Sequence, residues 1–227
     1  PKSRNLISKI SNDDFSNETF KFGYGKFVTL GSKKVWAQRL SYVGELGFEL
    51  YIENKDAREI YQLIVKEGKN HDLSHCGSHA MDTMRMESGF LHWGHDISPE
   101  ENQYEAGLNF AISYKKETNF IGKESLLKTK DKKQNRRFIM LSLKDSKPGT
   151  PLLLHEEPIY LGDRIIGRTT SGNYSFNYKK NLSFGYVSSS HSNEELSKLN
   201  LYIEVAKKKY QAIVEITPLK DKQARIL

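Results

Sequence analysis

Two residues with ligand-binding chemistry, Tyr42 and Glu49, flank a glycine-containing turn in the segment 40–50. Gly44 and Gly47 lie three residues apart, a spacing that favours a turn whose backbone another group can approach closely. Beyond the turn, Glu49 alternates with apolar neighbours, so a strand would direct its carboxylate to the opposite face. Because a desolvated carboxylate needs N–H donors, we expect Glu49 to lie in a cleft and meet a ligand. The residues alone leave open that Glu49 pairs with a lysine or arginine at a strand end.

Two further acidic residues have spacings that suit ion pairs. Glu45 lies between the two glycines and is expected to cap the turn or to form a surface salt bridge. Asp82 and Arg85 have the spacing of an ion pair on a helix, which contributes only a few tenths of a kcal/mol. These patterns predict structural roles, and no catalytic acid or base is assigned to this chain.

His92, His95 and Asp96 surround Trp93 and Gly94 with spacings that suit metal ligands on a loop. The chain has one cysteine and no second cluster of this kind, so we predict no metal site. No Gly-x-Gly-x-x-Gly follows a strand and no Gly-Lys-Ser/Thr loop occurs. The sequence therefore predicts no dinucleotide site and no phosphate loop in this segment.

The elements that must position these residues change along the chain from mixed to all-strand. Strands are predicted at 27–30, 35–40 and 48–52, and helices at about 55–67, 78–87 and 123–128. Two helix faces are expected to point inward, one with Ala57, Ile60, Tyr61, Ile64 and Val65, the other with Ala80, Met81 and Met84. Later strands are predicted at 138–141, 158–160, 165–167, 183–187, 201–205 and 210–216.

The charged stretch 130–137 lacks apolar periodicity and is the predicted domain boundary. We expect an α+β domain over residues 1–129, with a mixed sheet and flanking helices, followed by a small barrel-like all-β domain over 130–227. The sequence starts with Pro1 and has no secretory signal, so we expect a processed product or a fragment. No apolar run approaches the roughly 20 residues that span a bilayer.

The formal net charge of +7 permits anionic partners such as nucleic acid, phosphate or polyglutamate. The lysines are scattered in short runs, however, and a solvated surface explains them better. We therefore predict neither a nucleic-acid nor a membrane partner. The single cysteine, Cys76, excludes an internal disulfide and fits a reducing compartment.

The segment Tyr42-Val43-Gly44-Glu45-Leu46-Gly47-Phe48-Glu49 resembles a block of the aminomethyltransferase (glycine-cleavage T-protein) superfamily, in the variant found in dimethylglycine and sarcosine dehydrogenases. Further blocks follow in the family's order: Pro1-Lys2-Ser3-Arg4, Ala80-Met81-Asp82-Thr83-Met84-Arg85-Met86-Glu87, Trp93-Gly94-His95-Asp96-Ile97, Glu105-Ala106-Gly107-Leu108, Phe120-Ile121-Gly122-Lys123-Glu124 and Thr170-Ser171-Gly172. The resemblance implies a folate-binding domain, cut inside its first part, and a C-terminal barrel.

The resemblance also implies a site for tetrahydrofolate. Glu49 would accept the amino group and ring N–H of the pterin, and Tyr42 would stack on the ring or donate its hydroxyl. Arg85, Trp93 and Arg225 are further candidate folate-binding residues. Aminomethyltransferases proper carry an arginine where this chain has Met81, which moves the resemblance toward the dehydrogenases.

Resemblance finally implies one-carbon transfer. An upstream domain with FAD, not bound by this segment, would oxidise dimethylglycine or sarcosine, and this module would capture the iminium carbon as methylene-tetrahydrofolate. The family's aspartate for this step lies before the block that matches Pro1, so we expect the fragment alone to be inactive. A stand-alone aminomethyltransferase or tetrahydrofolate-dependent demethylase is one alternative, and a non-enzymatic binder of folate or nucleic acid is another. We expect a cytoplasmic protein, or one of the mitochondrial matrix if eukaryotic.

Overall fold

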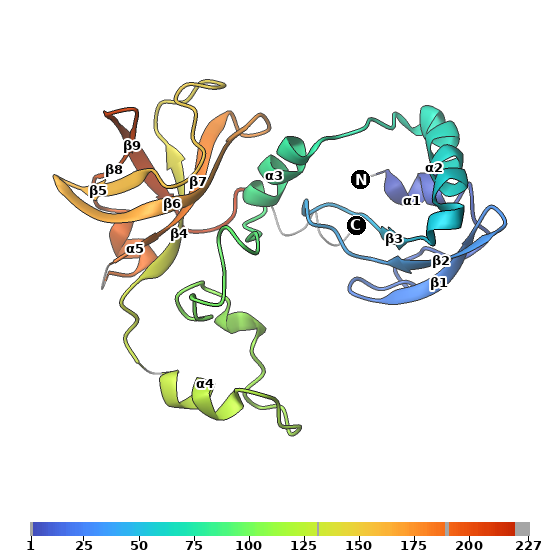
Figure 1. Cartoon of the computed structure of the whole chain (residues 1–227), viewed down its shortest axis with the longest axis horizontal. Coiled ribbons are helices and arrows are strands. Elements are labelled where there is room, and N and C mark those ends of the chain that lie inside the picture. The colour runs from blue at the N-terminus through green and yellow to red at the C-terminus, as the bar shows by residue number, and fades with distance from the viewer. Residues whose placement is uncertain (1, 131, 189–190, 221–227) are drawn as a thin grey trace. The chain divides into compact units, whose positions relative to one another are not determined.

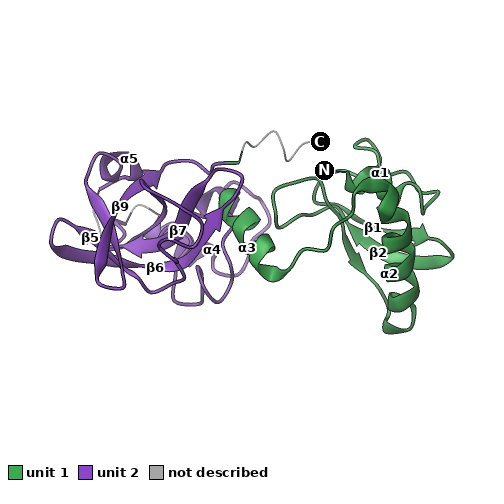
Figure 2. Cartoon of the chain, turned by 90° about the horizontal axis from the view of Figure 1, so that it is seen from above, with its two compact units in different colours: residues 1–88, 220–227 green, residues 89–219 purple. Residues whose placement is uncertain are grey.

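The structure is a computed structural model that describes residues 2–130, 132–188 and 191–220. The chain divides into two compact units, Pro1–Ser88 with Lys220–Leu227, and Gly89–Leu219 (Figure 2). In the described part of the chain, no helix has both the length and the apolar character needed to cross a bilayer. The predicted α+β class, ending in a closed β-barrel, is confirmed.

The first unit contains a three-stranded antiparallel sheet in the order β1-β2-β3 (Figure 1). Its strands are β1 (Gly25–Leu30), β2 (Lys33–Gln38) and β3 (Glu49–Tyr51), and its helices are α1 (Ser3–Ile7), α2 (Asn54–Gly68), the short 3-10 turn η1 (Lys69–His71) and α3 (Ser78–Glu87). The predicted hairpin is confirmed, with Leu30 opposite Lys33. The described strands of this sheet are antiparallel throughout rather than mixed.

One face of this sheet forms the core of the first unit. Strand alternation places Val28, Leu30, Val35 and Ala37 on that face, each at most 2% exposed. They pack with Leu6 and Ile7 of α1 and with Ile60 of α2. Both helices therefore cover the same side of the sheet.

The predicted inward faces of α2 and α3 are partly wrong. On α2, Ile60 is buried and Leu63 and Ile64 pack on the core, whereas Ala57 and Tyr61 are exposed. On α3, Ala80 and Met81 are exposed and Met84 is half-buried, whereas the buried residues are Arg85, Met86 and Glu87. The reason is that only the C-terminal end of α3 is covered, where Ser88 contacts the backbone near Gly44.

The second unit is a closed six-stranded barrel in the order β4-β7-β6-β5-β8-β9, preceded by the segment 89–136. Its strands are β4 (Arg137–Leu143), β5 (Pro158–Leu161), β6 (Arg164–Ser175), β7 (Lys180–Val187), β8 (Leu201–Val205) and β9 (Lys208–Glu215). Its short helices are η2 (Asn109–Ala111), α4 (Lys123–Thr129) and α5 (Asn193–Leu196). Inward-facing side chains fill the barrel, among them Ile139, Leu141, Ile159, Leu201 and Ile203. Every strand predicted after residue 137 is confirmed.

The two compact units meet at Ser88 and Gly89 along the chain. The segment 89–129 joins the barrel unit because Arg136, one residue before β4, pairs with Glu101 and Glu105 at 3.0 and 3.4 Å. The backbone N–H of Phe138 also donates to the carbonyl of Glu105. A domain boundary at residue 130 stays a prediction.

Candidate functional site

The turn after β2 is built around Gly44, which lies in the left-handed region with φ +68°. A Cβ at this position would collide with the Oγ and Cβ of Ser88. Ser88 Oγ donates to the carbonyls of Val43 (3.3 Å) and Met84 (3.1 Å), so it joins the turn to the end of α3. The predicted close approach to a glycine backbone is confirmed at Gly44, while Gly47 does not adopt a positive φ.

Glu45 anchors the same turn through a salt bridge. Lys220 Nζ lies 2.6 Å from Glu45 Oε1 and donates to the carbonyl of Val43 at 3.2 Å. The two side chains are only 24% and 12% exposed, so the pair is shielded from solvent. Burial by itself raises the pKa of the Glu45 carboxyl, the hydrogen bond and charge of Lys220 lower it, and the net pKa lies below the usual value. The sequence predicts that Glu45 caps the turn or forms a surface salt bridge; the salt bridge is confirmed, but it is shielded and not at the surface.

Glu49 begins β3, the edge strand of the sheet, and its side chain is exposed. The hydroxyl of Tyr51 donates to Glu49 Oε2 at 3.0 Å, and this bond raises the pKa of the Tyr51 hydroxyl. Tyr42 is half-buried. The expectation that Glu49 lies in a cleft is therefore wrong for this chain in its described conformation. Its role toward a ligand stays a prediction.

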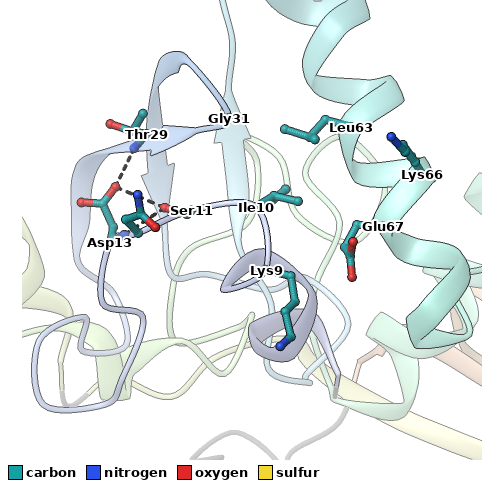
Figure 3. Close-up of a pocket in the computed structure, with 10 residues that line it drawn as sticks. Lys9, Ile10, Ser11, Asp13, Thr29, Gly31, Leu63, Lys66 and Glu67 are labelled. Carbon is teal, nitrogen blue, oxygen red and sulfur yellow. Dashed lines mark hydrogen bonds between the residues drawn. The ribbon is translucent and has the colours of Figure 1, made fainter.

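A cavity of about 550 Å³ does lie in the first unit, but neither Tyr42 nor Glu49 lines it. Its wall combines the turn after α1, the end of β1 and one side of α2, as Figure 3 shows for Ile10, Asp13 and Leu63. Asp13 Oδ2 accepts the backbone N–H of Thr29 at 2.6 Å, so this carboxylate holds the wall together.

Arg85 forms the ion pair predicted with Asp82. Its Nε and Nη2 both lie 2.7 Å from Asp82 Oδ1, and the arginine is 1% exposed. A guanidinium held in this way stabilises α3 and is not presented to solvent. Trp93, in the second unit, is 65% exposed, and Arg225 lies outside the described residues.

A buried carboxylate that the sequence did not single out for binding, Asp96, organises the second unit. It is 1% exposed. Its Oδ1 accepts the hydroxyls of Thr170 (2.5 Å) and Ser171 (2.8 Å) of β6, and its Oδ2 accepts the N–H of His92 (2.9 Å). Tyr186 of β7 donates to the Asp96 carbonyl at 2.9 Å. Asp96 thus fixes the loop 92–96 on the barrel.

This arrangement bears on the histidines of the same loop. The rings of His92 and His95 lie 4.6 Å apart at the surface, while the Asp96 carboxylate points to Thr170 and Ser171. Among the described residues, no group of three or more His, Cys, Asp or Glu side chains could hold a metal ion. Asp96 belongs to the block Trp93-Gly94-His95-Asp96-Ile97, and its carboxylate contacts the block Thr170-Ser171-Gly172. The presence of both blocks in the sequence is the signal that could have identified Asp96.

Comparison with known families extends over most of the chain. The profile described as "GCVT N-terminal domain" matches residues 1–116, and that described as "Glycine cleavage T-protein C-terminal barrel domain" matches residues 136–221. The chain belongs to the glycine cleavage T-protein family. The second match covers the barrel strands β4 to β9, and the resemblance inferred from the blocks is confirmed.

Three relatives illustrate the range of this family. The chain is 38% identical to the formaldehyde-forming 4-methylaminobutanoate oxidase of Paenarthrobacter nicotinovorans, over 77% of this chain and 21% of the oxidase. It is 34% identical to mitochondrial dimethylglycine dehydrogenase of Homo sapiens, over 96% of this chain and 25% of that protein. It is 33% identical to an aminomethyltransferase of Listeria welshimeri, over 96% of this chain and 57% of the relative. The relatives are named as an oxidase, a dehydrogenase and an aminomethyltransferase, and the chain spans only about a fifth to three fifths of their lengths.

A solved structure shows the same fold. The glycine cleavage system aminomethyltransferase T of Bartonella henselae matches with a TM-score of 0.78 at 20% identity. The match covers 96% of this chain and 57% of the other. At this identity the likeness establishes the fold alone.

Proposed function

We propose that the chain is the tetrahydrofolate-binding, one-carbon transfer module of a flavin-dependent dehydrogenase that acts on dimethylglycine or sarcosine. The observation that carries the proposal is the match to dimethylglycine dehydrogenase over 96% of this chain. That match leaves three quarters of the relative outside it, which is room for a separate flavin domain. The human relative is named as mitochondrial, which supports the matrix as location if the source is eukaryotic.

Glu49 is the residue that would hold the pterin. It stands at the start of β3 behind a turn that is fixed by the Gly44–Ser88 contact and the Glu45–Lys220 pair. Tyr51 donates to one of its carboxylate oxygens. A carboxylate can accept two parallel N–H donors as a charge-assisted pair, and the pterin amino group and ring N–H offer that pattern. Tyr42, at the other end of the turn, would contact the ring.

The chemistry assigned to this module is capture rather than oxidation. FAD bound elsewhere in the parent protein supplies the oxidation of the N-methyl group. This chain's residues would hold the folate amine close to the electrophilic carbon and keep water from it, because water would release the carbon as formaldehyde. Tetrahydrofolate and a methylated glycine are thus the small-molecule partners of the proposal.

The proposal is tested with Glu49→Ala in the full dehydrogenase. Hydrogen bonds to a charged group contribute about 1.5–3 kcal/mol, so folate affinity is expected to fall about 10- to 100-fold. Amine oxidation should continue at its normal rate, with formaldehyde replacing methylene-tetrahydrofolate as product. The matched control is Glu53→Ala, because Glu53 is also exposed and pairs with Lys55 at the surface. Unchanged folate affinity in Glu49→Ala would reject the assignment.

A stand-alone aminomethyltransferase is the second candidate, favoured by the Listeria welshimeri relative, of which the chain covers the larger share. The two candidates differ in the flavin. A purified parent protein with flavin absorbance and amine oxidase activity supports the dehydrogenase, whereas a colourless protein that transfers an aminomethyl carbon to tetrahydrofolate supports the transferase.

A further inference from the structure

Two arginines of the first unit, Arg4 and Arg39, lie close together, and neither has an acidic partner among the described residues. Arg39 directly follows β2 and continues the alternation of Val35 and Ala37, so its side chain points to the core face of the sheet. It is only 4% exposed. Arg4 belongs to α1, which covers that face, and is half-buried. The two residues are called here the arginine pair.

Each member of the arginine pair uses only part of its hydrogen-bonding capacity. Arg39 Nη1 donates to the carbonyl of Phe20 at 2.8 Å, and Arg4 Nη2 donates to Asn17 Oδ1 at 2.5 Å. The Nε atoms of both arginines are buried and have no partner in the described part of the chain. Because a guanidinium carries five N–H donors in a planar fork, donors of both side chains remain available.

The available donors of Arg39 form one edge of its guanidinium. Nη1 serves the carbonyl of Phe20, so Nε and Nη2 remain, and these two atoms are neighbours in the planar group. An edge of this kind donates two parallel hydrogen bonds to two oxygens of one carboxylate or phosphate. A lysine has no such edge, because its ammonium group is a single point charge. The geometry of Arg39 is therefore suited to an oxyanion.

The charges of the arginine pair also favour an anion. Burial, the larger effect, lowers the pKa of the Arg39 guanidinium, and the positive charge of Arg4 lowers it further. Buried charges in proteins are usually paired with an opposite charge and hydrogen-bonded. Within the described ranges, Arg39 has only the carbonyl of Phe20 as a partner. An anion would supply both the opposite charge and the missing acceptors.

The acidic residues of the loop between α1 and β1 are directed elsewhere. Asp13 accepts the backbone N–H of Thr29 at 2.6 Å. Asp14 accepts the backbone N–H and the hydroxyl of Ser16 at 2.8 and 3.1 Å. Glu18 is exposed. These carboxylates hold the loop or face solvent, so the loop does not neutralise the two arginines.

We propose that the arginine pair binds a small oxyanion and that a phosphate group, free or part of a small molecule, is the ligand. Two positive charges favour a doubly charged group over a single carboxylate. Phosphate also has enough oxygens to accept hydrogen bonds from both guanidinium groups. Arg39 would bind through Nε and Nη2, and Arg4 through Nε, while Asn17 keeps Arg4 in place. The ligand would enter beside Arg4, the more accessible member of the pair.

This site is separate from the proposed contact with the pterin. Gln38 pairs in register with Glu49, so these two side chains share one face of the sheet. Arg39, the next residue after Gln38, points to the other face. Phosphate binding at the arginine pair is therefore independent of folate binding at Glu49.

The experiment follows the Nε–H signals of the arginines by NMR in the ¹⁵N-labelled chain. Inorganic phosphate is the probe, and sodium chloride at equal ionic strength is the comparison. Phosphate is expected to shift two Nε–H signals in a saturable manner, while chloride leaves them in place. Arg4→Lys and Arg39→Lys assign the two signals, because each substitution removes one of them.

The same variants test the contribution of each arginine. Both keep the positive charge but lose the Nε–Nη2 edge. Phosphate affinity is expected to fall about tenfold or more in each, as for the loss of a hydrogen bond to a charged group. The matched control is Arg58→Lys, because Arg58 is exposed on α2 of the same unit. Circular dichroism checks folding, and Arg4→Lys, at the half-buried position, decides the outcome if Arg39→Lys does not fold.

Three results overturn the proposal: no phosphate-dependent shift of these Nε–H signals, an equal shift in chloride, or an unchanged phosphate affinity in Arg4→Lys. Acetate that binds as tightly as phosphate would overturn the assignment of a doubly charged ligand. The assay contains no folate, so a failure of the proposed function leaves its result unaffected.

Discussion

Replacing Gly44 by alanine tests whether the turn before Glu49 is held by its contact with α3. Gly44 has φ +68°, and a Cβ there would meet the Oγ and Cβ of Ser88. The left-handed conformation costs a non-glycine residue about 1–2 kcal/mol. Ser88 cannot withdraw without losing its hydrogen bonds to Val43 and Met84, and overpacking of this kind costs about 1–3 kcal/mol. We therefore expect Gly44→Ala to destabilise the first unit by about 2–5 kcal/mol.

The assay is urea unfolding of the chain in a Trp93→Phe background, where Trp36 fluorescence reports on the first unit alone. This choice matters because a chain of two compact units need not unfold in one step. The matched control is Gly23→Ala in the same unit. Gly23 has φ +82°, and no atom lies within 4 Å of the position that a Cβ would take there, so only the backbone cost of about 1–2 kcal/mol applies.

A double variant separates the two contributions. Adding Ser88→Gly to Gly44→Ala removes both atoms that the new Cβ would meet, so the collision is relieved while the backbone strain remains. We expect a favourable coupling free energy of about 1–3 kcal/mol in this cycle. Equal costs for Gly44→Ala and Gly23→Ala, with no coupling to Ser88, would refute the reasoning.

Two further predictions concern buried or shielded carboxylates. Asp96→Asn keeps the shape of the side chain but replaces an acceptor oxygen with a donor. We expect the free energy of unfolding of the second unit to fall by about 2–3 kcal/mol. Trp93 fluorescence in a Trp36→Phe background follows this unfolding. Asp163→Asn, a control at an exposed carboxylate of the same unit, should change little, and an equal effect of both would contradict the role of Asp96. Glu45→Gln should destabilise the first unit by about 1 kcal/mol at pH 7. Since folding lowers the pKa of Glu45, the stabilisation is present above the unfolded value near 4.5 and is lost as pH falls through the folded pKa. The difference between wild type and Glu45→Gln should therefore shrink between about pH 5 and pH 3, and a difference that grows on acidification would show that the sign is wrong.

Local patterns predicted the elements well because each is encoded within a few residues. The bounds of α3 agree with the expected 78–87, and the hairpin between β1 and β2 follows from alternation and a short glycine turn. Burial was harder to predict because it depends on what covers an element. Met81 has the residue type of a core position and is 42% exposed, while Arg85 of the same helix is 1% exposed. Asp82, one turn away, makes that burial possible by pairing with the guanidinium.

At the candidate site, too, the contacts of a residue could not be predicted from its neighbours in the sequence, because its partners lie far along the chain. The partners of Asp96 lie 74 and 75 residues later in the chain, and the partner of Glu45 lies 175 residues later. Spacing within a motif contains no information about such contacts. Residue type and the alternation of apolar residues identified Glu49 as a candidate. They did not predict that its side chain is exposed.

The resemblance blocks separate into two kinds by what their polar groups contact. Gly44, Glu45 and Asp96 are engaged by other parts of their own unit, through Ser88, Lys220 and the β6 hydroxyls. Glu49 and Trp93 instead project from the surface. Residues of the first kind are explained by folding, since each satisfies a strained backbone or a buried charge. Glu49 is exposed, as glutamates usually are, so folding neither requires nor opposes its proposed contact with the pterin, and the folate affinity of Glu49→Ala decides the question.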